Sequence, residues 1–179
     1  MPNTYSQIHI QFVFAVKYRH SLIVPSIRER VEKYIAGIVK SLQHKMLAIY
    51  CMPDHTHLLA GVRPHQSMAD LMREVKSRSS EFINKEMITS EKFSWQEGYG
   101  AFSYSQSQVA DVINYVRRQP EHHRKKSFRE EYVDLLNKFE IGYEDRYLFN
   151  WLDTGATPTE PCAERSIYST KEGSSGAAH

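Results

Sequence analysis

The chain has 179 residues, of which 41% are hydrophobic and 25% charged, with a formal net charge of +2 at pH 7. These values are typical of a globular protein with its own core, and two cysteines, Cys51 and Cys162, argue against a disulfide framework. The sequence has no secretory signal pattern and no run near the roughly 18 apolar residues of a membrane span, so we expect a cytoplasmic protein.

The first predicted strand covers residues 8–16, where every even position is apolar. This period of two is typical of a strand with one buried face. A helix is predicted to follow from Pro25, because apolar residues recur there at helical spacing. Ser26 and Glu29 have the spacing of a capping box and are expected to begin this helix.

Two further strands are predicted at residues 45–52 and 55–62. Pro53 and Asp54 separate them and favour a tight hairpin turn. A second helix is predicted to begin after Ser67, which is followed by apolar residues at helical spacing.

The fourth strand is expected within residues 93–104. Ser107 is predicted to cap a third helix, which Pro120 ends because proline lacks the amide proton that a helix interior needs. A fourth helix is predicted over residues 128–139, where large apolar side chains again follow the helical period.

The order strand, helix, strand, strand, helix, strand predicts an α+β fold of the ferredoxin-like type, also called split βαβ or RRM-like. One antiparallel sheet should carry the first two helices on one face and leave the other face for a ligand, a partner or the third helix. We expect a domain at residues 1–151. Residues 152–179 are poor in large apolar residues and are expected to form a flexible tail.

His55 and His57 are one residue apart in the third predicted strand. Side chains of a strand alternate between its faces, so the two imidazoles should project from the same face and could hold one metal ion. Histidines with this spacing are as often surface or core residues as metal ligands. The pair is therefore half of a candidate site.

Tyr115 and Gln119 are four residues apart and should share one side of the third helix. The amide oxygen of Gln119 suits a hard cation, so two histidines and a glutamine with open positions favour Mg²⁺ or Mn²⁺. The Tyr115 phenol can serve as a nucleophile. The alternatives are a half-buried structural tyrosine and a glutamine that only caps its helix. His122 and His123 are expected to face phosphate or solvent.

Five stretches together resemble the single-tyrosine HUH transposases of small bacterial insertion sequences, a group of TnpA-type proteins that includes the REP-associated tyrosine transposases. The stretches are Met52–Val62, Phe93–Gly100, Asn114–Gln119, Glu121–His123 and Tyr143–Tyr147. The likeness spans roughly residues 3–150. Thr56 departs from the family pattern, which has a bulky hydrophobe between the histidines. It should point to the helix-covered face and alter packing more than ligation.

The resemblance implies a DNA transposase that cleaves and rejoins single strands by transesterification. Tyr115 would form a 5′-phosphotyrosine intermediate, and His55, His57 and Gln119 would bind Mg²⁺ or Mn²⁺. Members of the family are homodimers that recognise DNA hairpins at the ends of the element. No nucleotide cofactor is implied, and the sequence contains no phosphate-binding loop of the Gly-x-x-x-x-Gly-Lys type.

Basic residues cluster around the end of the third predicted helix, as expected for a protein that binds a polyanion. The predicted contacts to the DNA backbone are Arg73, Lys76, Arg78, Arg117 and Arg118. Two other functions remain open at this stage. One is a domesticated or inactive relative that only binds single-stranded nucleic acid, since ferredoxin-like sheets also do so. The other is a metal-dependent phosphoesterase that uses water as its nucleophile.

Overall fold

A four-stranded antiparallel sheet with strand order β2-β3-β1-β4 forms the centre of the protein in the computed structural model, which describes residues 5–149. The strands are β1 (Ile8–Ala15), β2 (Lys45–Cys51), β3 (His55–Val62) and β4 (Gly100–Tyr104). The helices are α1 (Pro25–Ser41), α2 (Met68–Lys85), α3 (Val109–Arg117), α4 (Gln119–His122) and α5 (Phe128–Lys138). The strand order and the β-α-β-β-α-β sequence confirm the ferredoxin-like α+β prediction.

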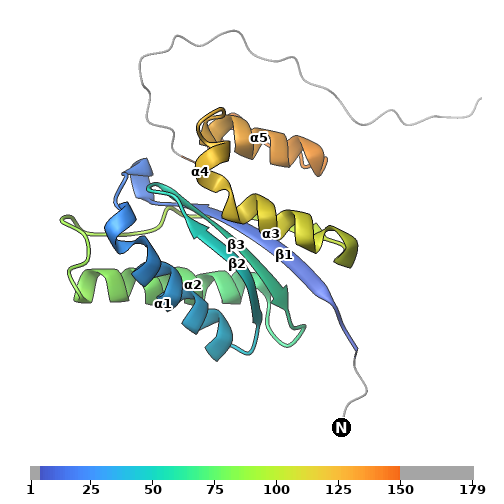
Figure 1. The fold of residues 1–179 in the computed structure, drawn as a ribbon, viewed down its shortest axis with the longest axis horizontal. Coiled ribbons are helices and arrows are strands. Elements are labelled where there is room, and N and C mark those ends of the chain that lie inside the picture. Colours follow the sequence, from blue (N-terminus) through green and yellow to red (C-terminus); the bar gives the residue numbers. More distant parts are fainter. Residues whose placement is uncertain (1–4, 150–179) are drawn as a thin grey trace, which may run out of the picture.

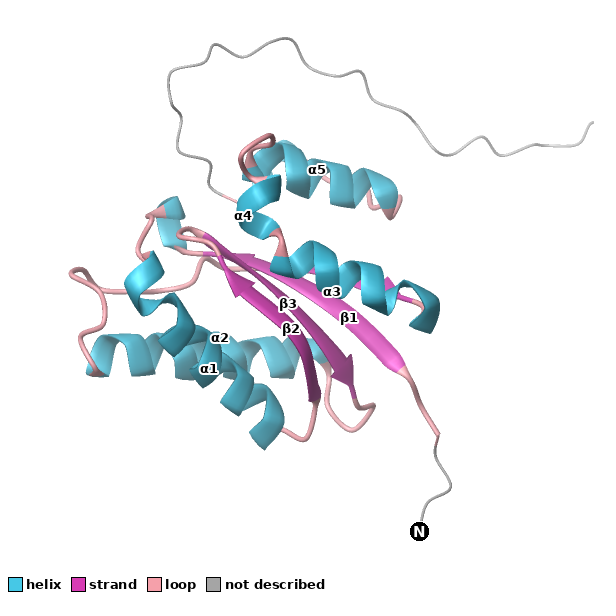
Figure 2. Cartoon of the chain, viewed as in Figure 1, coloured by secondary structure: helices cyan, strands magenta, loops and turns pink. Residues whose placement is uncertain are grey.

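Helices cover both faces of the sheet. Figure 1 shows α1 and α2 on one side and α3, α4 and α5 on the other, and Figure 2 shows the strands between these two layers. The face left open in the sequence prediction is therefore occupied by the third helix and by the helices that follow it.

The alternation of β1 explains the two layers. Phe12 and Phe14 belong to the larger apolar cluster beneath α1 and α2, whereas Val13 and Ala15 pack in a second cluster with α5. All four side chains are fully buried. Over residues 12–15 this central strand is thus apolar on both faces, as expected where both faces are covered.

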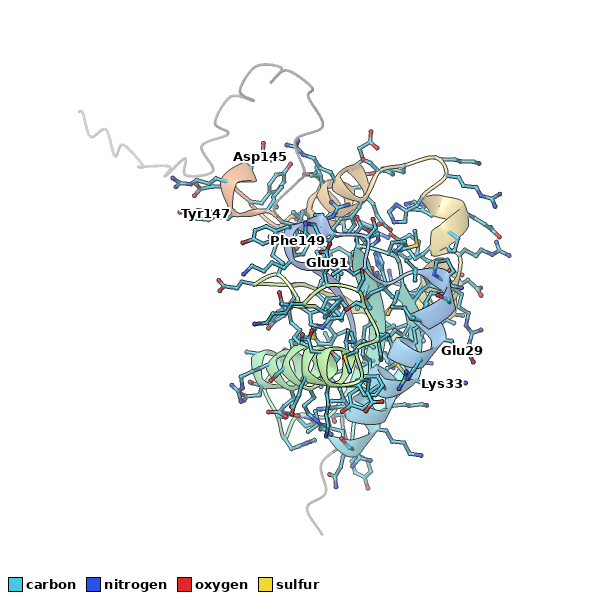
Figure 3. The ribbon with its side chains drawn as sticks, turned by 90° about the vertical axis from the view of Figure 1, so that its left-hand side faces the viewer. Glu29, Lys33, Glu91, Asp145, Tyr147 and Phe149 are labelled. Atoms are coloured by element: carbon cyan, nitrogen blue, oxygen red, sulfur yellow. The ribbon has the colours of Figure 1, made fainter. Side chains whose placement is uncertain are left out.

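The predicted helix caps at Ser26 and Ser107 are wrong. At α1 the N-cap residue is Val24, without a side-chain hydrogen bond, and Pro25 occupies the first turn, where its missing amide proton costs nothing. Glu29 instead pairs with Lys33 at 2.7 Å, and both residues are labelled on α1 in Figure 3. The predicted cap of Ser67 on α2 is confirmed, because its side chain accepts a hydrogen bond from the Asp70 amide.

At the third helix, Ser105 forms the cap that was predicted for Ser107. Its side chain and that of Gln108 make a reciprocal capping box around the 3₁₀ turn Gln106–Gln108, from which α3 continues. Within residues 5–149, no helix is long and apolar enough to cross a membrane. The predicted tail at 152–179 lies outside the described residues.

Gly100 is the tightest point of β4. A Cβ atom there would lie 2.9 Å from the Phe102 ring and 2.9 Å from the Tyr132 ring. We expect Gly100→Ala to lower the free energy of unfolding by about 1–3 kcal/mol, the usual cost of overpacking a core. Gly37→Ala is the matched control, since its Cβ would meet nothing within 4 Å and alanine favours a helix by about 1 kcal/mol. Urea denaturation measures the free energy of unfolding of both variants. If Gly100→Ala does not change this free energy, the Phe102 and Tyr132 rings can move aside to make room for the methyl group.

Candidate active site

Strand β3 supplies the first two side chains of the site. His57 lies opposite Val13 and His55 opposite Ala15 in the register with β1, so both imidazoles project from the same face of the strand, as predicted. That face is covered by α3 and α5. Both are buried. Thr56 lies opposite Phe14 and therefore faces the α1 and α2 layer, also as predicted.

A chain of contacts fixes the His55 ring. Its Nδ1 lies 2.7 Å from Asp54 Oδ1, and the Arg19 Nε donates to the other carboxylate oxygen at 2.9 Å. On the far side, the ring of Phe128 stacks on the imidazole at 3.9 Å between centroids. Burial lowers the pKa of His55 to about 4 in spite of the neighbouring Asp54. The imidazole is therefore neutral at physiological pH, which is the form that binds metals.

Asp54 remains charged in this arrangement. Burial would raise the pKa of its carboxyl, but the hydrogen bond with His55 and the Arg19 guanidinium hold the pKa well below its usual range. A carboxylate behind a histidine fixes the ring orientation and the tautomer, an arrangement that recurs behind metal-binding histidines.

His123 and Glu131 complete a cluster that was not predicted from the sequence. His123 Nε2 lies 3.0 Å from His55 Nε2 and 3.0 Å from Glu131 Oε2, which in turn lies 3.3 Å from His57 Nε2. Ligand atoms of all four residues lie within 4.8 Å of one another, so the cluster could hold a metal ion. The expectation that His123 faces phosphate or solvent is wrong for this residue, although His122 is one-third exposed.

One sequence signal could have found Glu131. It follows Phe128 by three residues and Leu135 follows it by four, so an acid sits on the apolar face of the last helix. Buried carboxylates are uncommon unless they are paired. Glu131 also lies in the first turn of α5, where the helix dipole favours negative charge.

The two oxygens of Glu131 divide their contacts. Oε2 faces the imidazoles, whereas Oε1 accepts hydrogen bonds from the Tyr115 hydroxyl and from Gln119 Nε2, the latter at 2.9 Å. Burial alone would raise the pKa of Glu131, but His57, His123 and the Tyr115 hydroxyl hold it well below the usual range. The carboxylate is therefore ionised.

Tyr115 and Gln119 meet in space as predicted, but they lie on different helices. The backbone turns at Arg118, so α3 ends at Arg117 and Gln119 begins α4. Tyr115 is partly buried, and its ring centroid lies 5.9 Å from that of His57 in the same chain. Burial and the adjacent Glu131 raise the pKa of the phenol, which is therefore protonated in this arrangement.

Unsatisfied polar atoms show that the site fits a cation. Among the described residues, His57 Nε2, Gln119 Oε1 and Glu131 Oε2 are buried without a hydrogen bond, although Glu131 Oε2 lies 3.3 Å from His57 Nε2 and 3.0 Å from His123 Nε2. Such atoms cost free energy unless a partner arrives. Imidazole nitrogens, an amide oxygen and a carboxylate are ligands that divalent ions accept.

Two cavities connect the tyrosine with the surface. One, of about 340 Å³, is lined by Tyr115, His122 and Glu131, and the other, of about 900 Å³, is lined by Tyr115, Arg118 and Lys125. Both lie between α3 and α5. The lining of the larger cavity also includes Glu121, Glu130 and Asp134, so acidic and basic side chains alternate along this approach to the phenol.

The five predicted DNA contacts fall on two faces of the sheet. Arg117 and Arg118 end α3 beside the tyrosine, whereas the other three lie on α2 across the sheet. Arg73 pairs with Asp70 at 2.7 Å, and Lys76 Nζ donates to the carbonyl oxygen of Gly98 at 2.6 Å. Arg78 donates to the Ser41 hydroxyl at 3.2 Å. The α2 residues do not lie beside Tyr115.

Comparison with known proteins identifies relatives. The family described as "Transposase IS200 like" matches residues 4–119. The ISDra2 transposase TnpA of Deinococcus radiodurans is 23% identical over 118 residues, which are 63% of this chain and 84% of that protein. A crystal structure of a putative transposase from the same organism aligns with a TM-score of 0.53 and 20% identity over 66% of this chain and 95% of that one.

A second structure has the same fold. The REP-associated tyrosine transposase bound to a REP hairpin aligns with a TM-score of 0.52 and 13% identity, over 69% of this chain and 73% of the other. The family match ends at residue 119, so His123 and Glu131 lie beyond the segment that the family description covers.

The charge of Glu131 provides a test of the metal cluster. Because a ligand that binds only the folded state raises its stability, we expect MnCl₂ to raise the thermal midpoint of the protein. Glu131→Gln should weaken Mn²⁺ binding by at least about 10-fold and reduce this rise, since a carboxylate oxygen is replaced by a neutral amide. Glu130→Gln is the control, because this exposed neighbour only caps α5 and glutamine retains that cap.

Differential scanning fluorimetry with and without EDTA measures these shifts. Equal Mn²⁺ responses in Glu131→Gln and in the unchanged protein would show that the carboxylate is not a ligand. No response in the unchanged protein would contradict a metal site in this cluster.

Proposed function

This chain belongs to the family of IS200-like transposases, and from this premise we propose that it cleaves and rejoins single-stranded DNA with Tyr115 as its nucleophile. The observation that carries the proposal is the contact of the Tyr115 hydroxyl with Glu131 at the edge of the imidazole cluster. A phenol, a buried carboxylate and several imidazoles are the components of metal-assisted phosphoryl transfer.

In the proposed step the Tyr115 oxygen bonds to the phosphorus of a DNA phosphodiester while the bond from phosphorus to the 3′-oxygen breaks. The phenol loses one proton and the departing oxygen gains one. The products are a 5′-phosphotyrosine and a strand with a 3′-hydroxyl. Attack by another 3′-hydroxyl reverses the step at a new junction, so no nucleotide cofactor is required.

Glu131 is the group in contact with the proton that the phenol must lose. While this negative carboxylate faces Tyr115, it raises the pKa of the phenol and disfavours ionisation. A positive charge near the imidazoles would lower the pKa of the phenol, because it attracts both the carboxylate and the developing phenolate. The cluster is thus placed to control the ionisation of the nucleophile.

We assign the metal to His55, His57 and Gln119, with His123 and Glu131 as additional ligands. The unsatisfied Gln119 Oε1 supports the assignment that the sequence favoured. Oxygen ligands beside the imidazoles support Mg²⁺ or Mn²⁺. A divalent ion supplies Lewis acidity toward a phosphate oxygen and offsets charge in the transition state.

The proposal extends to the substrate and the assembly. Recognition of DNA hairpins at element ends follows from the family resemblance, and the similar structure bound to a REP hairpin supports it. We further propose a homodimer in the cytoplasm. Tyr115 and the imidazoles meet within one chain, so the site as described does not require a partner's tyrosine.

Salt dependence tests the predicted backbone contacts. Arg118→Ala should weaken binding of single-stranded DNA and reduce the slope of log K against log salt by about 0.7, because one fewer counterion is released. Arg63→Ala is the control, since Arg63 follows the end of β3 far from His55. Fluorescence anisotropy at several salt concentrations gives the slopes.

Arg73→Ala in the same series tests the contacts predicted on α2. A loss equal to that of Arg118→Ala would mean that DNA crosses both faces of the molecule. A slope equal to that of the unchanged protein would contradict the prediction that Arg73 contacts the DNA backbone.

The phenol itself is tested by a denaturing gel. Incubation with single-stranded DNA from the flanks of the gene and Mn²⁺ should give a covalent protein–DNA band, which EDTA prevents. Tyr115→Phe should reduce this band by at least about 10³-fold because the nucleophilic oxygen is gone, while DNA binding is retained. Tyr34→Phe is the control, because Tyr34 packs on Phe82 in the opposite layer.

The other outcomes identify the alternatives. Cleavage without a covalent band, unaffected by Tyr115→Phe, would indicate a phosphoesterase that uses water. Binding without cleavage in the unchanged protein would indicate a relative that only holds nucleic acid.

A further inference from the structure

A cavity of about 520 Å³ lies beside β4, away from the residues assigned above. Its walls come from β4, from α5 and from residues 141–148, which follow α5. Most of this lining lies beyond residue 119, where the family match ends. The lining also includes residues of Phe93–Gly100 and Tyr143–Tyr147, two stretches that contribute to the family resemblance and have no role in the site described above.

Tyrosines dominate the lining. Tyr99, Tyr132, Tyr143 and Tyr147 all contribute to it. Tyr132 is buried, whereas Tyr143 is 40% exposed and Tyr147 is 73% exposed. Figure 3 shows Tyr147 at the periphery of the molecule. Large aromatic faces that stay exposed in one place indicate a binding surface rather than a core.

The charged residues at the rim of the cavity are paired with each other. The Arg146 guanidinium lies 4.7 Å above the Tyr147 ring, and its Nε donates to Glu144 at 2.7 Å. Glu144 therefore does not present an unpaired negative charge to an approaching phosphate. The same arginine holds the Tyr147 ring through a cation–π contact.

The backbone of β4 adds hydrogen-bonding groups. Within the described residues β4 pairs only with β1, so its other edge carries amide and carbonyl groups that no strand satisfies. Gly100 and Phe102 of this strand line the cavity. A flat ligand stacked on the tyrosines could form hydrogen bonds with this edge.

The cavity shares α5 with the catalytic cluster. Glu131 faces Tyr115, and the next residue, Tyr132, lines the cavity. A strand bound at the tyrosine would therefore have a neighbouring aromatic pocket along the same helix. Its volume lies within the range of about 300–1,000 Å³ usual for small-ligand sites, which accommodates one nucleotide.

We propose that this cavity binds one unpaired nucleobase of the single-stranded DNA substrate, stacked on Tyr143 or Tyr147. The proposal rests on the proposed function for its substrate. Stacking on aromatic side chains is sequence-tolerant and is the usual way in which proteins hold unpaired bases. The tyrosines supply the faces, and the free edge of β4 supplies donors and acceptors for the edge of the base.

Photocrosslinking of the full chain tests this directly. Single-stranded DNA from the flanks of the gene is prepared with 5-iodouracil in place of one thymine at a time, irradiated with the protein and analysed by mass spectrometry. We expect a crosslink to Tyr143 or Tyr147 from a limited set of positions. Tyr147→Ala should weaken DNA binding by about 5- to 100-fold, the usual effect of removing one stacking partner.

Tyr5→Ala is the matched control, because Tyr5 is 95% exposed and does not line the cavity. It should leave both the crosslink and the affinity unchanged. Because Tyr147 is exposed, its alanine variant should remain folded, and a thermal midpoint equal to that of the unchanged protein verifies this.

Formation of the Tyr115 adduct in the same samples separates the two proposals. An adduct without any crosslink in the cavity, and with full affinity in Tyr147→Ala, would overturn the pocket and leave the proposed function intact. A crosslink without an adduct would support the pocket and contradict the nucleophilic role of Tyr115. The absence of DNA binding altogether would overturn both.

Discussion

The alternation of side chains along β3 is the constraint on which the rest of the structure depends. Leu58 and Ala60 enter the core beneath α1 and α2, so His55 and His57 must face the other way. A shift of one residue in the register with β1 would turn the imidazoles into the apolar layer beneath α1 and α2 and would move Leu58 to the face covered by α3 and α5. The pairing of β3 with β1 therefore determines both which side chains enter the core and which face carries His55 and His57.

The second layer is organised around a single carboxylate. Glu131 brings α5 into contact with β3 through His57 and with the α3–α4 corner through Tyr115 and Gln119. An ionised carboxylate is costly to bury unless its partners compensate, so these contacts specify where α5 must sit. Phe128 adds an apolar contact by stacking on His55. Packing and charge thus fix the same helix.

Much of this arrangement could be predicted from the sequence, because local periodicity determines the elements. The even positions of β1 and the His-x-His spacing of β3 each follow from a period of two, and the order of elements gives the sheet. The caps predicted at Ser26 and Ser107 were wrong for different reasons. The first helix begins at Pro25 without a side-chain cap, whereas Ser105, two residues before Ser107, takes the role at the third helix. His123 and Glu131 were missed because their proximity to β3 depends on the turns at Arg118 and after α4. Those turns are set by tertiary packing rather than by spacing.

The position of Glu131 late in the chain has a consequence for biosynthesis. A ribosome releases the β3 histidines first, then Tyr115, and only afterwards the helix that carries the carboxylate. The nascent protein therefore passes through a stage in which the Tyr115 phenol has emerged without its hydrogen-bond acceptor. Emergence of α5 ends that stage, so the order of translation also orders the assembly of the site.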